Sequence, residues 1–195
     1  MSASIRGTFL KDARMYFDAL PEIAMNAAVM AVNQVAERDA LPLIRRNTEN
    51  QIAFPKGYLD QQDRLGITRK ATRGSLEAVI TARDRPTSLA RFAPGQTPEN
   101  TRRGGVTVRV KHGRTKHLGK AFLVRLNSGN VGLATRDKSL VGRAYKPAVL
   151  GRGVYLLYGP SVDQVFGGVA ADALPVIGNK LSKEFLRQFT RLSRG

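Results

Sequence analysis

The sequence predicts an α+β protein: a long N-terminal helix, a central antiparallel β-sheet of about five to seven strands, and a C-terminal helix. Apolar residues recur at helical spacing between residues 22 and 36 and again after Gly178. Between residues 65 and 158 they alternate with polar residues, as in strands with one buried face. With 195 residues and 42% apolar content, the chain is large enough for one domain with a real core. We predict that this domain spans residues 1–166 and that residues 167–195 form an amphipathic basic appendage.

The N-terminal helix is predicted from residue 22 onward. Pro21 suits the first turn of a helix, and Glu22 beside it complements the helix dipole. Pro42 is expected to kink or break this helix, because proline lacks an amide hydrogen and its ring clashes with the preceding turn. A second helical piece, Leu43 to about Ile52, is predicted to follow. One face of the first helix carries small apolar residues, which implies close approach of another element: Ala24, Ala27, Ala28, Ala31, Val32 and Val35.

Period-two alternation and intervening turn residues locate the strands. Pro86 to Phe92 is predicted as a short connector or an edge strand. Residues 94–105 are rich in Pro, Gly and Asn and are predicted as a loop. The predicted strands are residues 65–70 and 76–80 around a turn at 72–75, residues 106–110, residues 121–126 and 131–135 around a turn at 127–130, and residues 154–158.

The C-terminal region is predicted to be helical in two parts. Ser161 can cap a first helix, with Gln164 completing a capping box. The Gly-Gly pair at 167–168 and Pro175 weaken the helix that follows, whereas the pattern after Gly178 is clean. The apolar stripe there is interpreted as a packing face, and the basic side as a surface for a membrane, nucleic acid or a subunit. The stripe is Leu181, Phe185, Phe189 and Leu192, and the basic side is Lys180, Lys183, Arg187, Arg191 and Arg194.

The charge is concentrated in one part of the chain. The formal net charge is +17, and the segment from Thr101 to Val162 carries thirteen Lys and Arg but a single carboxylate, Asp137. Because these cations alternate with apolar residues, the segment is predicted to be folded and to face a polyanion, with DNA first, or an acidic partner.

A mobile basic hairpin or loop is predicted to emerge from the strand that ends at Val110. Long cations around Gly113 and Gly119 can reach phosphates. Without a recognition helix or stacking aromatic residues in this loop, any DNA contact is predicted to be non-specific. The alternative is that these charges solvate the surface or contact acidic protein. The predicted nucleic-acid-facing residues are Arg109, Lys111, Arg114, Lys116 and Lys120.

Several classes of function find no support in the sequence. There is no Cys, and the two His residues, His112 and His117, have no metal-ligand spacing, so no metal and no cofactor are expected. No P-loop, nucleophile elbow or metalloprotease motif is present, and we expect no enzymatic activity. The stretch Ile23 to Ala36 is too short and too polar to span a bilayer, and no membrane partner is expected.

Ser161 belongs to a compact turn, which is interpreted as structural or as an interface. The turn consists of Tyr158, Gly159, Pro160, Ser161 and Val162.

Taken in order, several stretches resemble the minor tail protein Z family, the tail completion proteins of long-tailed bacteriophages. The resemblance covers roughly residues 8–166, and its fragments are specific as an ordered set rather than singly. The segment from Asp137 to Arg152 is more basic than the pattern of the family. The matching stretches are the Ala-rich N-terminal helix, residues 65–78, 82–92, 105–111 and 120–124, the Ser128-Gly129 turn, and residues 158–162.

This resemblance implies a structural virion protein at the head-proximal end of a phage tail, made in the host cytoplasm. It implies a closed ring, commonly of six copies, that helps join head and tail and lines the DNA channel. The implied partners are further copies of the chain, tail terminator and head-side connector proteins, and packaged double-stranded DNA. A different class stays open from the residues alone: a stand-alone, non-specific nucleic-acid-binding protein.

Overall fold

The computed structural model describes residues 22–61, 63–101, 104–141 and 148–194. The chain divides into two compact units. The helical unit comprises the described residues of 1–48, 59–84 and 162–195, and the strand unit comprises residues 49–58 and 85–161. The N-terminal stretch before residue 22, where the resemblance begins, lies outside the described residues.

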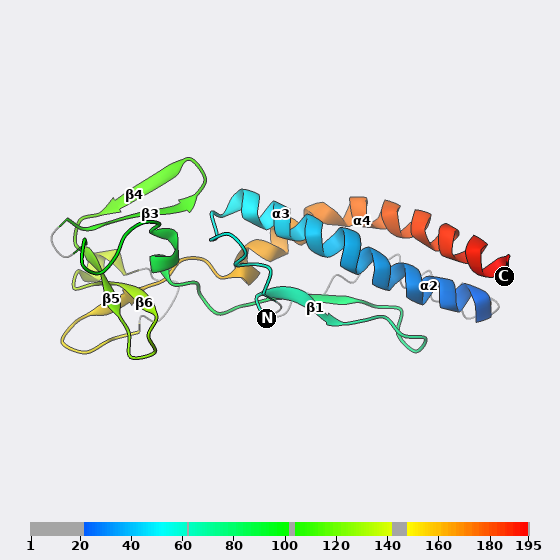
Figure 1. The fold of residues 1–195 in the computed structure, drawn as a ribbon, viewed down its shortest axis with the longest axis horizontal. Coiled ribbons are helices and arrows are strands. Elements are labelled where there is room, and N and C mark those ends of the chain that lie inside the picture. Colours follow the sequence, from blue (N-terminus) through cyan, green and yellow to red (C-terminus); the bar gives the residue numbers. More distant parts are fainter. Residues whose placement is uncertain (1–21, 62, 102–103, 142–147, 195) are drawn as a thin grey trace. The chain divides into compact units, whose positions relative to one another are not determined.

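The helical unit is built on two long helical segments. Helix α2 (Glu22–Val35) is confirmed where it was predicted, and its small residues Ala24, Ala27, Ala28 and Ala31 are buried. It packs along α4 (Val162–Ser193), which lies beside it in Figure 1. Alanine side chains let the two helix backbones approach closely, so the predicted packing face has its partner within the same chain.

Pro42 does not break the helix. A π-helical turn, η1 (Ala36–Ala40), joins α2 to α3 (Leu41–Gln51), and Leu41 donates its N–H to the carbonyl of Ala36, five residues back. A proline ring collides with the carbonyl four residues before it. The wider π turn just before Pro42 relieves that collision, which is why the helix continues through the proline. Of the predicted kink or break, the structure shows no break, but the π turn interrupts the regular α-helix just before Pro42. The predicted second helical piece is confirmed as α3.

Helix α4 is a single 32-residue helix. The Gly-Gly pair at 167–168 and Pro175 lie inside it, as does the predicted domain boundary at residue 167. Packing explains the continuity, because burial of an apolar face outweighs weak helix propensity. The residues buried along this first half are Val162, Val165, Phe166, Val169, Ala170 and Ala173.

In the second half of α4 the predicted apolar stripe is only half-buried. The buried residue there is Gln188, whose Nε2 donates to Gln34 Oε1 on α2 over 3.3 Å and to Glu184 Oε1 over 2.6 Å. Arg187 Nε also donates to Glu184 Oε2, at 2.8 Å. A polar network therefore joins α2 to the end of α4, where the pattern predicted apolar packing.

The helical unit also holds the first predicted hairpin. Strand β1 (Leu65–Arg69) pairs antiparallel with β2 (Val79–Ala82), with a register shift between Ile67 and Arg69. The second strand begins three residues later than predicted. Asn33 of α2 forms two hydrogen bonds with the backbone of Ala71, at 2.8 and 3.0 Å, and so ties the hairpin to the helix.

The strand unit contains two separate sheets. Strand β3 (Val106–Lys111) pairs with β4 (Arg114–Leu118), and β5 (Ala121–Arg125), β6 (Val131–Thr135) and β7 (Tyr155–Leu157) form a second sheet in that order. Two 3-10 helices, η2 (Leu89–Phe92) and η3 (Lys138–Leu140), complete it. All pairings are antiparallel.

The α+β class is confirmed, but the prediction of one central sheet of five to seven strands is wrong. Among the described residues the strands form three sheets, of two, two and three strands. Strand β3 pairs with β4, in the segment for which the sequence predicts a mobile basic hairpin or loop. Strands β3 and β4 form one sheet, and β5, β6 and β7 form another.

Candidate polyanion-binding hairpin and the pocket beside it

The β3–β4 hairpin carries most of the predicted site. Arg109 and Lys111 lie on β3 and Arg114 and Lys116 lie on β4, and all four are exposed. These four residues are called the hairpin cations below. Gly113, at the turn, has a φ of 68°, a left-handed conformation that glycine adopts without steric cost. The hairpin therefore presents four long cations on two short, twisted strands.

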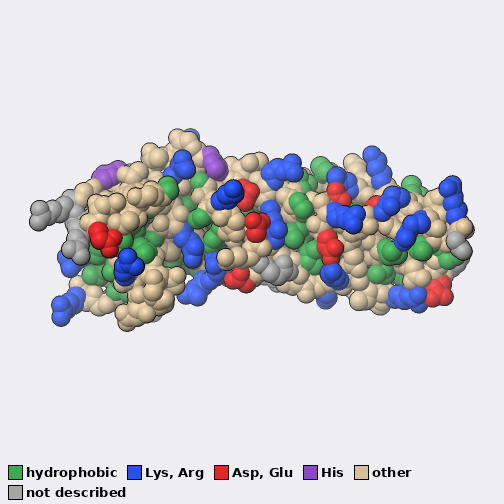
Figure 2. All heavy atoms as spheres, viewed as in Figure 1, with side chains coloured by type: hydrophobic (Ala, Val, Ile, Leu, Met, Phe, Trp, Pro, Cys, Tyr) green, Lys and Arg blue, Asp and Glu red, His purple; other side chains and the backbone are tan. Residues whose placement is uncertain are grey.

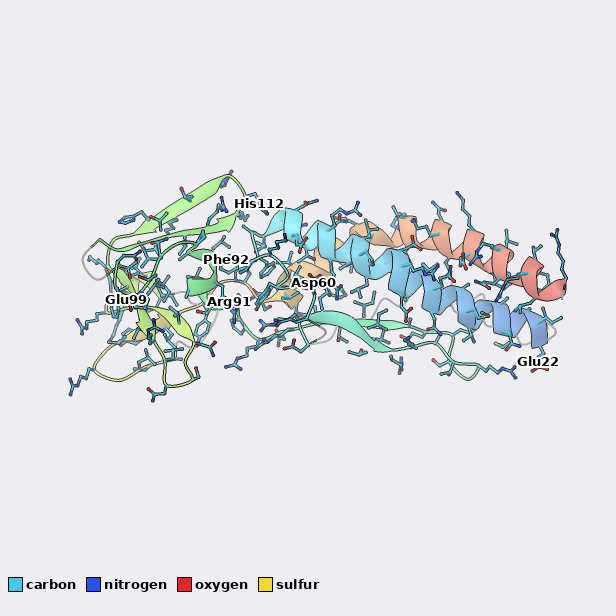
Figure 3. The ribbon with its side chains drawn as sticks, in the orientation of Figure 1. Glu22, Asp60, Arg91, Phe92, Glu99 and His112 are labelled. Atoms are coloured by element: carbon cyan, nitrogen blue, oxygen red, sulfur yellow. The ribbon has the colours of Figure 1, made fainter. Side chains whose placement is uncertain are left out.

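Two contacts fasten the hairpin to residues 49–58. At the turn, His112 Nε2 lies 2.7 Å from the backbone oxygen of Glu49 (Figure 3). The amide of Ala53 donates to the carbonyl of Val110 over 2.8 Å. The predicted mobile basic hairpin is thus a hairpin held at its turn and along β3.

The two units differ in how their cations are paired. Among their described residues, the helical unit has thirteen Lys and Arg against ten carboxylates, and the strand unit has twelve against three. Over the helices, Figure 2 shows Asp and Glu side chains beside Lys and Arg. The ion pairs within the helical unit are Arg45–Asp60, Arg64–Asp63, Arg83–Asp63, Arg69–Glu77, Lys70–Glu37, Arg73–Glu22, Lys180–Asp39 and Arg187–Glu184.

By contrast, none of the hairpin cations forms an ion pair with any residue that the structure describes. Four like charges on a small exposed sheet repel one another. Distant carboxylates offset this repulsion only modestly, because water and salt screen exposed charges. An external anion relieves this repulsion. This local lack of counter-charge is visible only once the partners of each cation are known.

Lys120, the fifth predicted residue, is in a different environment. Its Nζ lies 2.9 Å from Asp137 Oδ2. The hydrogen bond from Lys120, together with those from Ser139, lowers the pKa of the Asp137 carboxyl from 3.8 to about 2. Asp137 also accepts the amide of Ser139 at 2.9 Å and caps η3. Lys120 is therefore set apart from the hairpin cations by its own counter-ion.

The predicted turn packs against η2. Gly159 donates its N–H to the carbonyl of Thr87 over 2.7 Å, and Tyr158 forms a β-bridge with Ser88. A Cβ on Gly159 would lie 3.1 Å from the ring of Phe92, a buried residue shown at η2 in Figure 3. Pro160 accepts the amide of Thr87 at 3.4 Å, while Ser161 and Val162, at the start of α4, are fully buried. These contacts hold the turn against η2 and the residues before it.

A pocket of about 470 Å³ brings the hairpin and the turn together. Lys111, Arg114 and Lys116 line it from the hairpin, and Tyr158 and Gly159 line it from the turn. Arg109, Lys120 and residues 160–162 do not. The aliphatic walls were not predicted, because aliphatic residues scattered along a sequence do not indicate that they line one pocket. These walls are Leu89, Val108, Val110, Leu118, Leu140 and Leu157.

The described part of the chain contains neither a metal-binding cluster nor a membrane-spanning helix. Within residues 22–61, 63–101, 104–141 and 148–194, no group of three His, Asp or Glu side chains is placed to hold a metal ion. Over the same ranges, no helix has the length and hydropathy needed to cross a bilayer.

Comparison with family models, with curated proteins and with solved structures finds no match to this chain.

Proposed function

We propose that this chain is a structural virion protein at the head-proximal end of a phage tail, where six copies form a closed ring that helps join head and tail and surrounds the DNA. Two lines support the proposal: the ordered resemblance over residues 8–166, and the hairpin cations. The single observation that carries it is that these four cations lack a counter-charge among the described residues while the helical unit pairs most of its own.

The chemistry of the hairpin suits a channel lining. Lys and Arg contact phosphates without reading bases, and DNA that slides through a channel must be held without sequence preference. A closed ring needs a heterologous interface, in which one surface of each copy meets a different surface of the next. The proposed neighbours of the ring are the tail terminator and the head-side connector proteins, and no cofactor or membrane takes part.

The hairpin cations, unpaired among the described residues, also support a second function. A stand-alone, non-specific nucleic-acid-binding protein would also carry free cations on an anchored hairpin. The two functions differ in assembly, because a stand-alone binder holds duplex DNA as a monomer or dimer. It also loses affinity steeply with salt, since each phosphate contact releases a counterion.

Assembly is tested first, by native mass spectrometry and electron microscopy of the full chain. A closed ring supports the neck protein. A monomer or dimer that binds duplex DNA tightly supports the stand-alone protein instead. A monomer that neither assembles nor binds DNA would contradict both functions.

The lining role is tested with a quadruple variant in which the hairpin cations become Gln. In the phage whose genome carries this chain, virions built with the variant are expected to keep their tails and to deliver DNA less efficiently. The matched control removes four exposed cations of the helical unit, Arg38, Arg46, Lys183 and Arg194, and is expected to deliver DNA normally. Loss of ring assembly in the first variant would show that the hairpin is a subunit interface, and the lining role would be wrong.

A further inference from the structure

We infer that the pocket beside the basic hairpin binds an extended acidic segment of a partner protein, with one aliphatic side chain of that segment in the pocket. Two kinds of side chain line the pocket: six aliphatic ones, three of which belong to the hairpin (Val108, Val110 and Leu118), and the cations Lys111, Arg114 and Lys116. Its volume of about 470 Å³ lies in the range of roughly 300–1,000 Å³ typical of ligand sites. An occupant must therefore be apolar and anionic at once.

DNA does not fit this requirement. Deoxyribose offers only small CH and CH₂ groups between polar oxygens, and placing a phosphate against leucine side chains costs free energy. Single-stranded bases stack on aromatic platforms, and Tyr158 is the one aromatic residue among the lining residues. Duplex DNA can contact the cations from outside, but it leaves the apolar walls exposed to water.

A second copy of this chain does not fit either. The described residues of the strand unit include twelve Lys and Arg against three carboxylates, so the strand unit of another copy brings an excess of positive charge to the cations of the pocket. Like charges brought together at an interface oppose binding. The complementary occupant is a segment of a different protein, rich in Asp and Glu, in which a Leu, Ile or Val lies among the acidic residues.

The strand that borders the pocket favours an extended conformation for this segment. Three consecutive residues of β4, Arg114, Thr115 and Lys116, line the pocket. Most of the hairpin residues that line the pocket alternate along their strands, with Val108 and Val110 on β3 and Arg114, Lys116 and Leu118 on β4. Because side chains of a strand alternate between its two faces, one face of the hairpin forms this wall of the pocket. Among the described strands β4 pairs with β3 alone, which leaves its other edge able to accept an added strand. In an alternative role, the cations on β4 only protect this edge from pairing.

The test measures binding of fluorescent peptides to the full chain by anisotropy. The first probe is the acidic peptide Glu-Glu-Leu-Glu-Glu, and the second has Ser in place of Leu. Burial of the leucine is expected to strengthen binding roughly tenfold over the serine peptide. Equal binding of the two peptides would overturn the inference, because it would leave only attraction between charges.

Arg114 and Arg109 provide a matched pair of variants. Both are exposed arginines of the hairpin, but only Arg114 lines the pocket. Arg114→Gln is expected to weaken binding of the leucine peptide several-fold and Arg109→Gln to leave it unchanged. Equal weakening by both variants would overturn the inference. Binding of a short DNA duplex is expected to fall to a similar extent in both, and this arm reports on the proposed function rather than on the pocket.

A variant of the apolar wall completes the test. Leu140 is half-buried and lies on the short helix η3, so Leu140→Gln changes the pocket without opening the core. It is expected to bind both peptides with the affinity of the serine peptide and to bind the DNA duplex as the unchanged chain does. An unchanged preference for the leucine peptide would show that the aliphatic side chain binds elsewhere. Circular dichroism of each variant confirms that it is folded.

Discussion

His112 donates from Nε2 to the backbone oxygen of Glu49 over 2.7 Å and so joins the turn of the basic hairpin to the end of α3. The carbonyl of Glu49 is one of the last four of the helix, which have no partner within it. Because a carbonyl can only accept, Nε2 must carry the proton in this contact. A residue that sequence analysis considered only as a rejected metal ligand therefore has a structural role.

Replacing His112 is expected to loosen the hairpin. His112→Ala removes one hydrogen bond and should lower the free energy of unfolding by about 0.5–1.5 kcal/mol. The amide of Ala53, which donates to Val110, should exchange its hydrogen faster, as measured by NMR. The control is His117→Ala, whose Nδ1 lies 3.1 Å from Thr107 Oγ1 within the same hairpin and which should leave the Ala53 amide unaffected. Equal exchange of that amide in both variants would show that the contact with Glu49 does not hold the hairpin.

Gly159→Val is expected to destabilise the fold by about 1–3 kcal/mol, the usual effect of overpacking. The reason is steric, since a Cβ at this position already lies 3.1 Å from the ring of Phe92. Thermal denaturation followed by circular dichroism measures the effect. Gly119→Ala is the control, because the nearest atom to its Cβ is 3.8 Å away. An unchanged melting temperature for Gly159→Val would contradict a structural role for the turn.

Substitutions at Gly105 and Gly129 distinguish two causes of lost stability: an unfavourable backbone conformation and a steric clash of the added Cβ. Their φ angles are 72° and 79°, so alanine at either position costs about 1–2 kcal/mol for the left-handed conformation. A Cβ on Gly105 would also lie 2.6 Å from the Cα of Gly119, whereas a Cβ on Gly129 meets nothing within 4 Å. Gly105→Ala should therefore be clearly less stable than Gly129→Ala in urea denaturation. Equal stability would show that the backbone at Gly119 moves aside freely.

The ion pair between Asp137 and Lys120 predicts a pH-dependent stability. The pKa of Asp137 is lowered to about 2 from 3.8, so the ionised carboxylate stabilises the folded state. This contribution is fully present above about pH 3.8 and is lost as the pH falls toward 2. Asp137→Asn, which can still cap η3, should melt at a lower temperature than the unchanged chain at neutral pH. The difference should vanish near pH 2, and a difference that is independent of pH would exclude the ion pair as its cause.

The elements whose burial follows a local period can be predicted from the order of the residues alone. The alanine face of α2, strand β3 and the β5–β6 hairpin all lie where the spacing of apolar residues predicted them. The unequal distribution of charge is also a property of the sequence alone. Local periodicity is informative here because each of these elements buries one face, and burial selects apolar residues at the period of the element.

Which elements and charges meet depends on the three-dimensional packing of the chain. Strand β4 has four exposed residues in five, so no burial pattern marks it, and it pairs with β3 in a sheet separate from that of β5, β6 and β7. Pro42 lies inside a helix because a π turn five residues long precedes it. Lys120 has a carboxylate partner and Arg114 has none among the described residues, although both belong to the same basic segment. Ion pairs and strand pairing join residues far apart in the chain, and their geometry is set by packing rather than by any local pattern.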